Sequence, residues 1–156
     1  MRRPKSERRT LRMASKSTPL MTIDRNGEFD PLGSLVMELN GYAHLSRNWD
    51  GRGAAPFELP LIFEVLRLSE TILDCCRKHE SRATRIASHP HPDGSIEVEF
   101  FRAERAISLR LHSNLQLDIQ YRGGGAPPDI LVYSEGLSLV VEAAGAWLCG
   151  LRIATG

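Results

Sequence analysis

The sequence predicts an α+β fold: two N-terminal helices, an antiparallel sheet of four or five strands, and one C-terminal helix. First, apolar and polar residues alternate from Ser95 to Tyr121, which is the pattern of strands with one buried face. Second, two short polar breaks, Arg102–Arg105 and His112–Asn114, divide this stretch, and connections so short join antiparallel neighbours. Third, the helical patterns precede and follow the strands, which argues against βαβ units. We expect the three helices to cover the apolar face of the sheet.

The N-terminal residues 1–29 show no apolar periodicity, so we expect a disordered basic arm before a single domain at 30–156. Residues 1–16 carry seven basic residues and one acid (+6), which leaves −5 for the rest of a chain of net charge +1. This arm could contact nucleic acid phosphates or an acidic partner, or it could be an extension without function, since Met13 and Met21 are alternative starts. The candidate phosphate-binding residues are Arg2, Arg3, Lys5, Arg8, Arg9 and Arg12.

The first helix is expected at 31–46, where Asp30 can cap it and Pro31 suits the first helical position. A second helix is expected at 59–80, with a strongly periodic apolar face. That face consists of Ile62, Val65, Leu66, Ser69, Ile72, Leu73 and Cys76.

Between these helices lies a glycine-rich loop at 48–56, and its Asp50-Gly51 pair is a turn signal. Trp49 could pin the loop to the core, which is the usual state of an indole, or it could be an exposed binding residue. In the second case the loop would present Asn48, Asp50 and Arg52 around the indole to a partner.

A short strand is expected at 82–87, followed by the segment His89-Pro90-His91-Pro92-Asp93-Gly94. The H-x-H-x-D spacing resembles a metal-ligand cluster, but the prolines and Asp-Gly favour a turn that leads into the meander. The three cysteines, Cys75, Cys76 and Cys149, lack both metal-site spacing and a disulfide framework. We expect reduced cysteines, with one or two of them in the core, and neither a metal nor a cofactor.

Two motifs, N-W-D-G-x-G-A-x-P at 48–56 and P-x-P-D-G-x-I-x-x-E-F at 90–100, together resemble a group of small uncharacterised bacterial proteins. The resemblance covers roughly residues 35–121 and excludes the basic arm and the Cys-Cys pair. It implies a bacterial protein of shared fold without an established activity. Because members of the group often occur as accessory genes, it also implies a role in toxin–antitoxin, immunity or phage-conflict systems.

The outer face of the meander is polar, which fits either a solvated surface or a docking surface. It carries Glu97, Glu99, Ser108, Arg110, His112, Gln116, Asp118 and Gln120. After the turn at 123–128, which lacks the context of a phosphate-binding loop, a strand is expected at 130–133. A last helix should begin at 134–136. Its apolar face consists of Val140, Ala144, Trp147, Leu148 and Leu151, and its small residues would allow packing on the sheet or on a second copy.

No local signature joins a nucleophile, a base and an orienting group, so the sequence favours a non-catalytic function. We expect a cytoplasmic, protein-binding module of a bacterial or phage conflict system, without a membrane span or secretory signal. A nucleic-acid-associated protein that uses the arm is the alternative, and a homo-oligomer could form through the last helix or a sheet edge. The predicted partner-binding residues are Asn48, Trp49, Asp50, Arg52, Glu97, Glu99 and Arg110.

Overall fold

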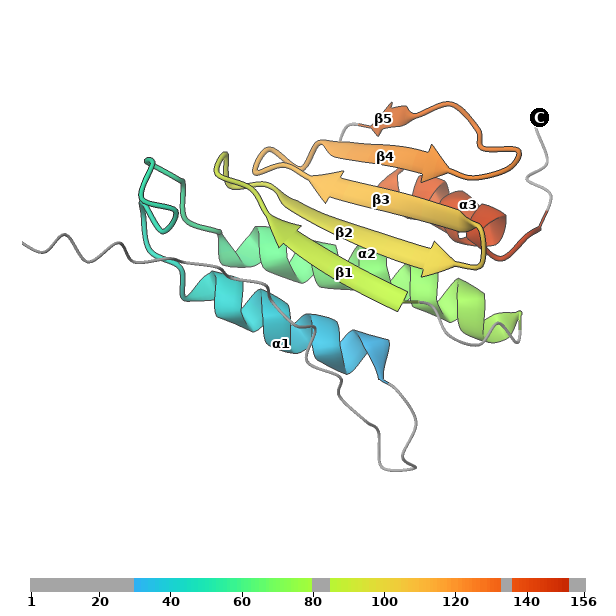
Figure 1. Cartoon of the computed structure of the whole chain (residues 1–156), viewed down its shortest axis with the longest axis horizontal. Helices are drawn as coiled ribbons and strands as arrows, with labels where there is room; N and C mark the ends of the chain where they lie inside the picture. Colours follow the sequence, from blue (N-terminus) through green and yellow to red (C-terminus); the bar gives the residue numbers. More distant parts are fainter. Residues whose placement is uncertain (1–29, 80–84, 133–135, 152–156) are drawn as a thin grey trace, which may run out of the picture.

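The computed structural model describes residues 30–79, 85–132 and 136–151, and it has the predicted α+β fold (Figure 1). The six candidate phosphate-binding residues of the arm and the predicted helix start at 134–135 lie outside these ranges. The elements follow one another as α1 (Pro31–Ala43), α2 (Leu59–Lys78), β1 (Arg85–Pro90), β2 (Ile96–Arg102), β3 (Arg105–Leu111), β4 (Leu117–Arg122), β5 (Ile130–Val132) and α3 (Leu137–Leu148).

The five strands form one sheet in the order β1-β2-β3-β4-β5, with every neighbouring pair antiparallel. The predicted meander is therefore confirmed. Its register places apolar residues opposite one another, as in the pairs Ile96↔Leu111 and Leu109↔Ile119. These side chains are at most 4% exposed, so the alternation in the sequence marks a buried inner face.

Helices α2 and α3 lie behind the sheet in Figure 1, whereas α1 lies alongside β1. The placement of all three helices over one face is not confirmed. Instead α1 contacts both α2 and β1, and the Tyr42 hydroxyl lies 2.8 Å from Ser88 Oγ on the edge strand. Ser88 also donates a hydrogen bond to the carboxylate of Glu38, which lies one helical turn before Tyr42 in α1. The first helix thus screens the sheet edge at β1, where open backbone groups would otherwise invite pairing.

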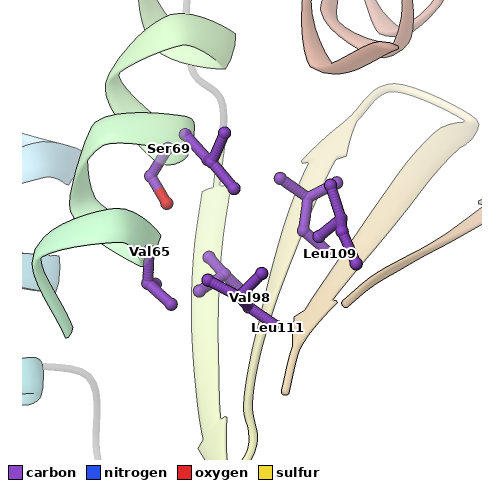
Figure 2. Close-up of a pocket in the computed structure, with 7 residues that line it drawn as sticks. Val65, Ser69, Val98, Leu109 and Leu111 are labelled. Atoms are coloured by element: carbon purple, nitrogen blue, oxygen red, sulfur yellow. The ribbon is translucent and has the colours of Figure 1, made fainter. Parts of the chain in front are cut away.

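A small cavity lies between α2 and the inner face of the sheet, shown in Figure 2. Its lining is apolar except for Ser69, whose side chain is 1% exposed and faces the strands. Among the described residues, the Ser69 hydroxyl has no hydrogen-bond partner. The remaining lining residues are Val65, Leu68, Val98, Leu109, Leu111 and Leu117. Because apolar side chains and one serine line the cavity, and no titratable side chain does, we interpret it as a gap in the packing of the core.

The β2–β3 hairpin holds the end of α3 through two arginines. Arg105 Nη1 donates to the Trp147 carbonyl at 2.5 Å, and Arg102 Nη1 donates to the Leu148 carbonyl at 3.3 Å. Cationic side chains suit this position because the last carbonyls of a helix lack intrahelical partners. Trp147 is 5% exposed and its indole donates to the Gly125 carbonyl, which confirms its predicted role in the core.

Several predicted boundaries were shifted by one to three residues. Leu115 was expected to start a strand, but its backbone has a φ of 62°, it lies in the hairpin turn, and β4 begins at Leu117. β1 continues to Pro90, so the predicted turn starts later than expected. Leu151 lies beyond the end of α3 and is 37% exposed, so its prediction as part of the helix face was wrong. None of the helices in the described ranges is long and apolar enough to cross a membrane.

Candidate binding surface

The two sequence motifs meet at one end of the sheet, where the loop 48–56 packs on the turn 91–95 (Figure 1). The Ala55 amide donates to the Pro92 carbonyl at 2.9 Å. Gly94 has a φ of 82°, and a Cβ at this glycine would lie 3.4 Å from Ala55 Cβ. Glycine is favoured there by the left-handed backbone. We call the segments 48–56 and 91–95 the loop–turn junction.

Trp49 anchors the junction to the core, as the structural interpretation of this residue predicts. Its indole Nε1 donates to the Ala55 carbonyl at 3.0 Å, and its ring centroid lies 5.8 Å from that of Phe57. Phe57 is 7% exposed and belongs to the main core. The indole is partly buried against this core, so it stabilises the loop from within.

Asn48 and Asp50 close the loop on itself with hydrogen bonds to its own backbone. Asn48 Oδ1 accepts from the Gly53 amide at 2.6 Å. Asp50 Oδ1 accepts from the amides of Arg52 and Ala54, and these two bonds lower the pKa of the Asp50 carboxyl. Arg52 itself is exposed. Of the four loop residues predicted to bind a partner, three therefore have structural contacts within the loop.

In the turn, Asp93 organises the connection between the junction and the sheet. Its carboxylate accepts hydrogen bonds from the Ser95 amide at 2.9 Å, from the Ser95 hydroxyl, and from Arg110 Nη2 at 2.9 Å. Burial by itself raises the pKa of Asp93, but the bonds from Ser95 and the Arg110 charge outweigh it and lower the pKa to about 2. Arg110 therefore points to the turn, although it lies opposite Glu97 in the strand register.

On the outer face of the sheet, Glu97 and Glu99 each bind two side chains from neighbouring strands or their ends. Glu97 accepts from the Ser108 hydroxyl and lies 2.9 Å from His91 Nε2. Burial raises the pKa of Glu97, but its hydrogen bonds to Ser108 and His91 and the nearby histidine charges lower it overall. A further histidine–carboxylate pair lies at β4, where His112 Nε2 is 2.8 Å from Asp118 Oδ2.

Glu99, like Glu97, binds two side chains, those of His89 and Arg122. Its Oε2 is 3.1 Å from His89 Nε2, and its Oε1 accepts from Arg122 Nη2. These contacts form four separate hydrogen-bonded groups, which lie on four strands and the turn, and we call their polar side chains together the outer-face network. Its members are His89, His91, Asp93, Ser95, Glu97, Glu99, Ser108, Arg110, His112, Asp118 and Arg122.

The chemistry of this network does not match that of a nucleophilic relay. In such a relay a histidine lies between the hydroxyl and the carboxylate. Here the Glu97 carboxylate lies between Ser108 and His91, and Ser108 is 2% exposed. The carboxylates of Asp50 and Asp93 bind different groups, the amides of the loop and the Arg110 guanidinium. Within the described ranges, no cluster of three or more histidine, cysteine or acidic residues is placed to hold a metal ion.

Sequence reasoning placed Glu97, Glu99 and Arg110 on the outer face but did not predict their partners. For His89 and His91 the sequence offered a metal-ligand cluster or, in preference, a turn that leads into the meander, and it predicted no role for Arg122. The register supplies the missing signal, because His89 lies opposite Glu97 and Ser108 lies opposite Glu99. Contacts of this diagonal kind require the strand pairing to be known.

The fold and this surface define a class of protein: a small α+β domain with one helix-covered sheet face and one polar face. No protein-family model, curated protein or solved structure matches the chain.

Proposed function

We propose that this protein is a non-catalytic module that binds another protein through the outer face of its sheet. The observation that carries the proposal is the outer-face network, whose four hydrogen-bonded groups include side chains of four strands, on a face that none of the described helices covers. Long polar side chains lose rotamer freedom on binding, so a face whose side chains are already held costs less to order.

Exposed polar groups lie in and beside this network. Gln120 is exposed on β4, and Arg122, which binds Glu99 within the network, keeps 56% of its side chain exposed at the end of the same strand. A partner would therefore meet exposed polar groups, some of them already held in place, a combination that suits specific and reversible recognition. The loop–turn junction, with exposed Arg52, would form one end of this surface.

Within this class, we propose a role as an antitoxin, an immunity protein or a modulator of a defence system in a bacterial or phage conflict system. This narrower proposal rests on the resemblance of the two motifs to small bacterial proteins, and the contact between the motifs at the junction supports their significance as a pair. A cytoplasmic location follows from the same proposal.

The charge of the arm supports a second candidate function, in which residues 1–16 bind nucleic acid. The arm carries +6 and the rest of the chain −5, so phosphate contacts would come from the arm. Binding of this kind weakens steeply with salt, whereas binding through the sheet face would respond much less.

The test is affinity capture from the native host lysate with the full chain and with a chain that lacks residues 1–21, with and without nuclease. We expect both chains to capture the same protein in a stoichiometric amount. Nucleic acid retained only by the full chain, and lost as salt increases, would favour the second function instead.

Two matched double variants locate the surface. Gln120→Lys/Arg122→Ala changes the outer face, and Glu70→Ala/Arg77→Ala changes exposed positions of α2 on the helical side, and both leave the net charge unchanged. We expect the first variant to reduce capture at least tenfold and the second to leave it unchanged. Equal capture by both variants would exclude the sheet face as the binding surface.

A further inference from the structure

Independently of the binding surface, the three cysteines of the chain come together where α2 and α3 end. Cys75 and Cys76 lie in the last turn of α2, and Cys149 directly follows α3. The Sγ atoms of Cys76 and Cys149 are 3.2 Å apart, although the residues are 73 positions apart in the sequence. Cys75 also has a side-chain hydrogen bond to Cys149. The expectation of one or two core cysteines did not include this convergence.

The close approach of the two helices explains the cluster. Gly145 of α3 faces α2, and a Cβ at this glycine would lie 3.1 Å from Cys75 Cβ. The missing side chain lets the helices pack closely at this point. As a result Cys76 and Cys149, which are 3% and 9% exposed, share one apolar environment.

We propose that Cys76 and Cys149 are a reversible oxidation site, at which a hydroperoxide converts the two thiols to a disulfide. In the first step one thiol loses its proton and the thiolate attacks a peroxide oxygen, so the O–O bond breaks, a sulfenic acid forms, and the leaving hydroxide takes up the proton to become water. In the second step the other thiol attacks the sulfenic sulfur, the S–S bond forms, and a second water leaves. Two thiols and one peroxide thus give one disulfide and two waters, and an external thiol reverses the reaction by exchange.

Geometry excludes one pair among the three thiols and favours Cys76 with Cys149. Consecutive Cα atoms across a trans peptide are about 3.8 Å apart, which is below the roughly 4.4–6.8 Å that a disulfide spans, so Cys75 and Cys76 do not pair with each other within the helix. Cys149 is the common partner, and its sulfur lies 3.2 Å from that of Cys76. A disulfide of about 2.05 Å requires the two sulfurs to approach by about 1.2 Å, a shift on the scale of a side-chain rotation.

The bond would connect the C-terminal ends of α2 and α3. Because it would close a loop of more than 70 residues, it should restrict the unfolded chain strongly. We expect the melting midpoint of the oxidised protein to rise by roughly 5–10 °C.

The test treats the folded full-length protein with hydrogen peroxide, alkylates the remaining thiols, and identifies disulfide-linked peptides by mass spectrometry under non-reducing conditions. One tryptic peptide, residues 68–77, contains both Cys75 and Cys76, so the assignment needs single variants. We expect the link in the wild type and in Cys75→Ser, and its loss in Cys76→Ser and Cys149→Ser. Dithiothreitol should reverse both the link and the shift of the melting midpoint.

Two outcomes overturn the proposal. One is a folded wild-type protein that stays unlinked under conditions that oxidise a free cysteine peptide. The other is a link that persists in Cys76→Ser and disappears in Cys75→Ser, which would identify Cys75 as the partner instead. Circular dichroism of each variant confirms that the fold is retained before oxidation.

Discussion

At the scale of single residues, most of the predicted binding residues also have a structural role. Asp50 and Asn48 bind their own loop, Trp49 is anchored beside Phe57, and Arg110 binds the turn. A loss of binding in any of these variants would therefore combine a change of surface with a change of stability. This overlap makes stability measurements necessary beside any binding experiment.

Trp49 provides the clearest case. We expect Trp49→Ala to lower the free energy of unfolding by ~2–3 kcal/mol, because it removes the packing on Phe57 as well as the hydrogen bond to Ala55. Trp49→Phe keeps an aromatic ring and should cost only about 1 kcal/mol. Urea unfolding followed by circular dichroism measures both values, and equal, near-zero losses would contradict the anchoring role.

Asp93 should make stability depend on pH in the acid range. Its pKa is about 2 in the folded protein, against an ordinary value of 3.8, so the unfolded chain binds more protons between these values. The stabilisation is present above about 3.8 and is lost as the pH falls towards 2. Denaturant unfolding of wild type and Asp93→Asn should differ most at neutral pH and converge near pH 2. Parallel pH curves would show that the ionised carboxylate contributes nothing.

At the scale of elements, the helices are fixed to the sheet by a few polar contacts as well as by the core. Arg105 holds the end of α3 through the Trp147 carbonyl, and its guanidinium lies 5.0 Å from the centroid of the Trp147 ring. We expect Arg105→Ala to cost about 1–2 kcal/mol and Arg105→Lys to recover part of this loss. Thermal unfolding measures the effect, and Arg77→Ala on the exposed face of α2 is the control.

Two of the buried serines, Ser69 and Ser88, should respond in opposite directions to removal of their hydroxyls. Ser69 faces the core cavity without a partner among the described residues, so Ser69→Ala should stabilise the protein by about 1 kcal/mol. Ser88 links Tyr42 and Glu38 of α1 to the sheet edge, so Ser88→Ala should destabilise it by about 1–2 kcal/mol. Changes of the same sign in both variants would contradict this explanation of the α2 and α1 contacts.

At the scale of the whole molecule, the sequence separates a charged arm from a periodic body. Because residues 1–29 lack apolar periodicity, we expect a chain that begins at residue 30 to melt within about 2 °C of the full chain. Differential scanning calorimetry checks this. A larger drop would show that the arm contributes to the folded core.

The sequence predicted the fold well because alternation and helical periodicity are local signals. The meander from Ile96 to Arg122 follows directly from its apolar pattern. Leu115 was misplaced because its left-handed backbone belongs to a turn, and an apolar residue there has no local signature. The contacts of the outer face could not be predicted, since pairs such as Arg122 with Glu99 depend on register and on side-chain direction. The convergence of Cys76 and Cys149 depends on how two helices pack, which spacing alone does not contain.

The junction between Ala55 and Gly94 also constrains how this sequence can diverge. The backbone bond from Ala55 to Pro92 is made by main-chain atoms and so does not depend on the side chains of these two residues. A Cβ at Gly94 would lie 3.4 Å from Ala55 Cβ, so larger side chains at either position would crowd the other. The positive φ of Gly94 also disfavours any side chain at this position. Positions 55 and 94 should therefore remain small together across related lineages, even where the charged residues of the sheet face are exchanged.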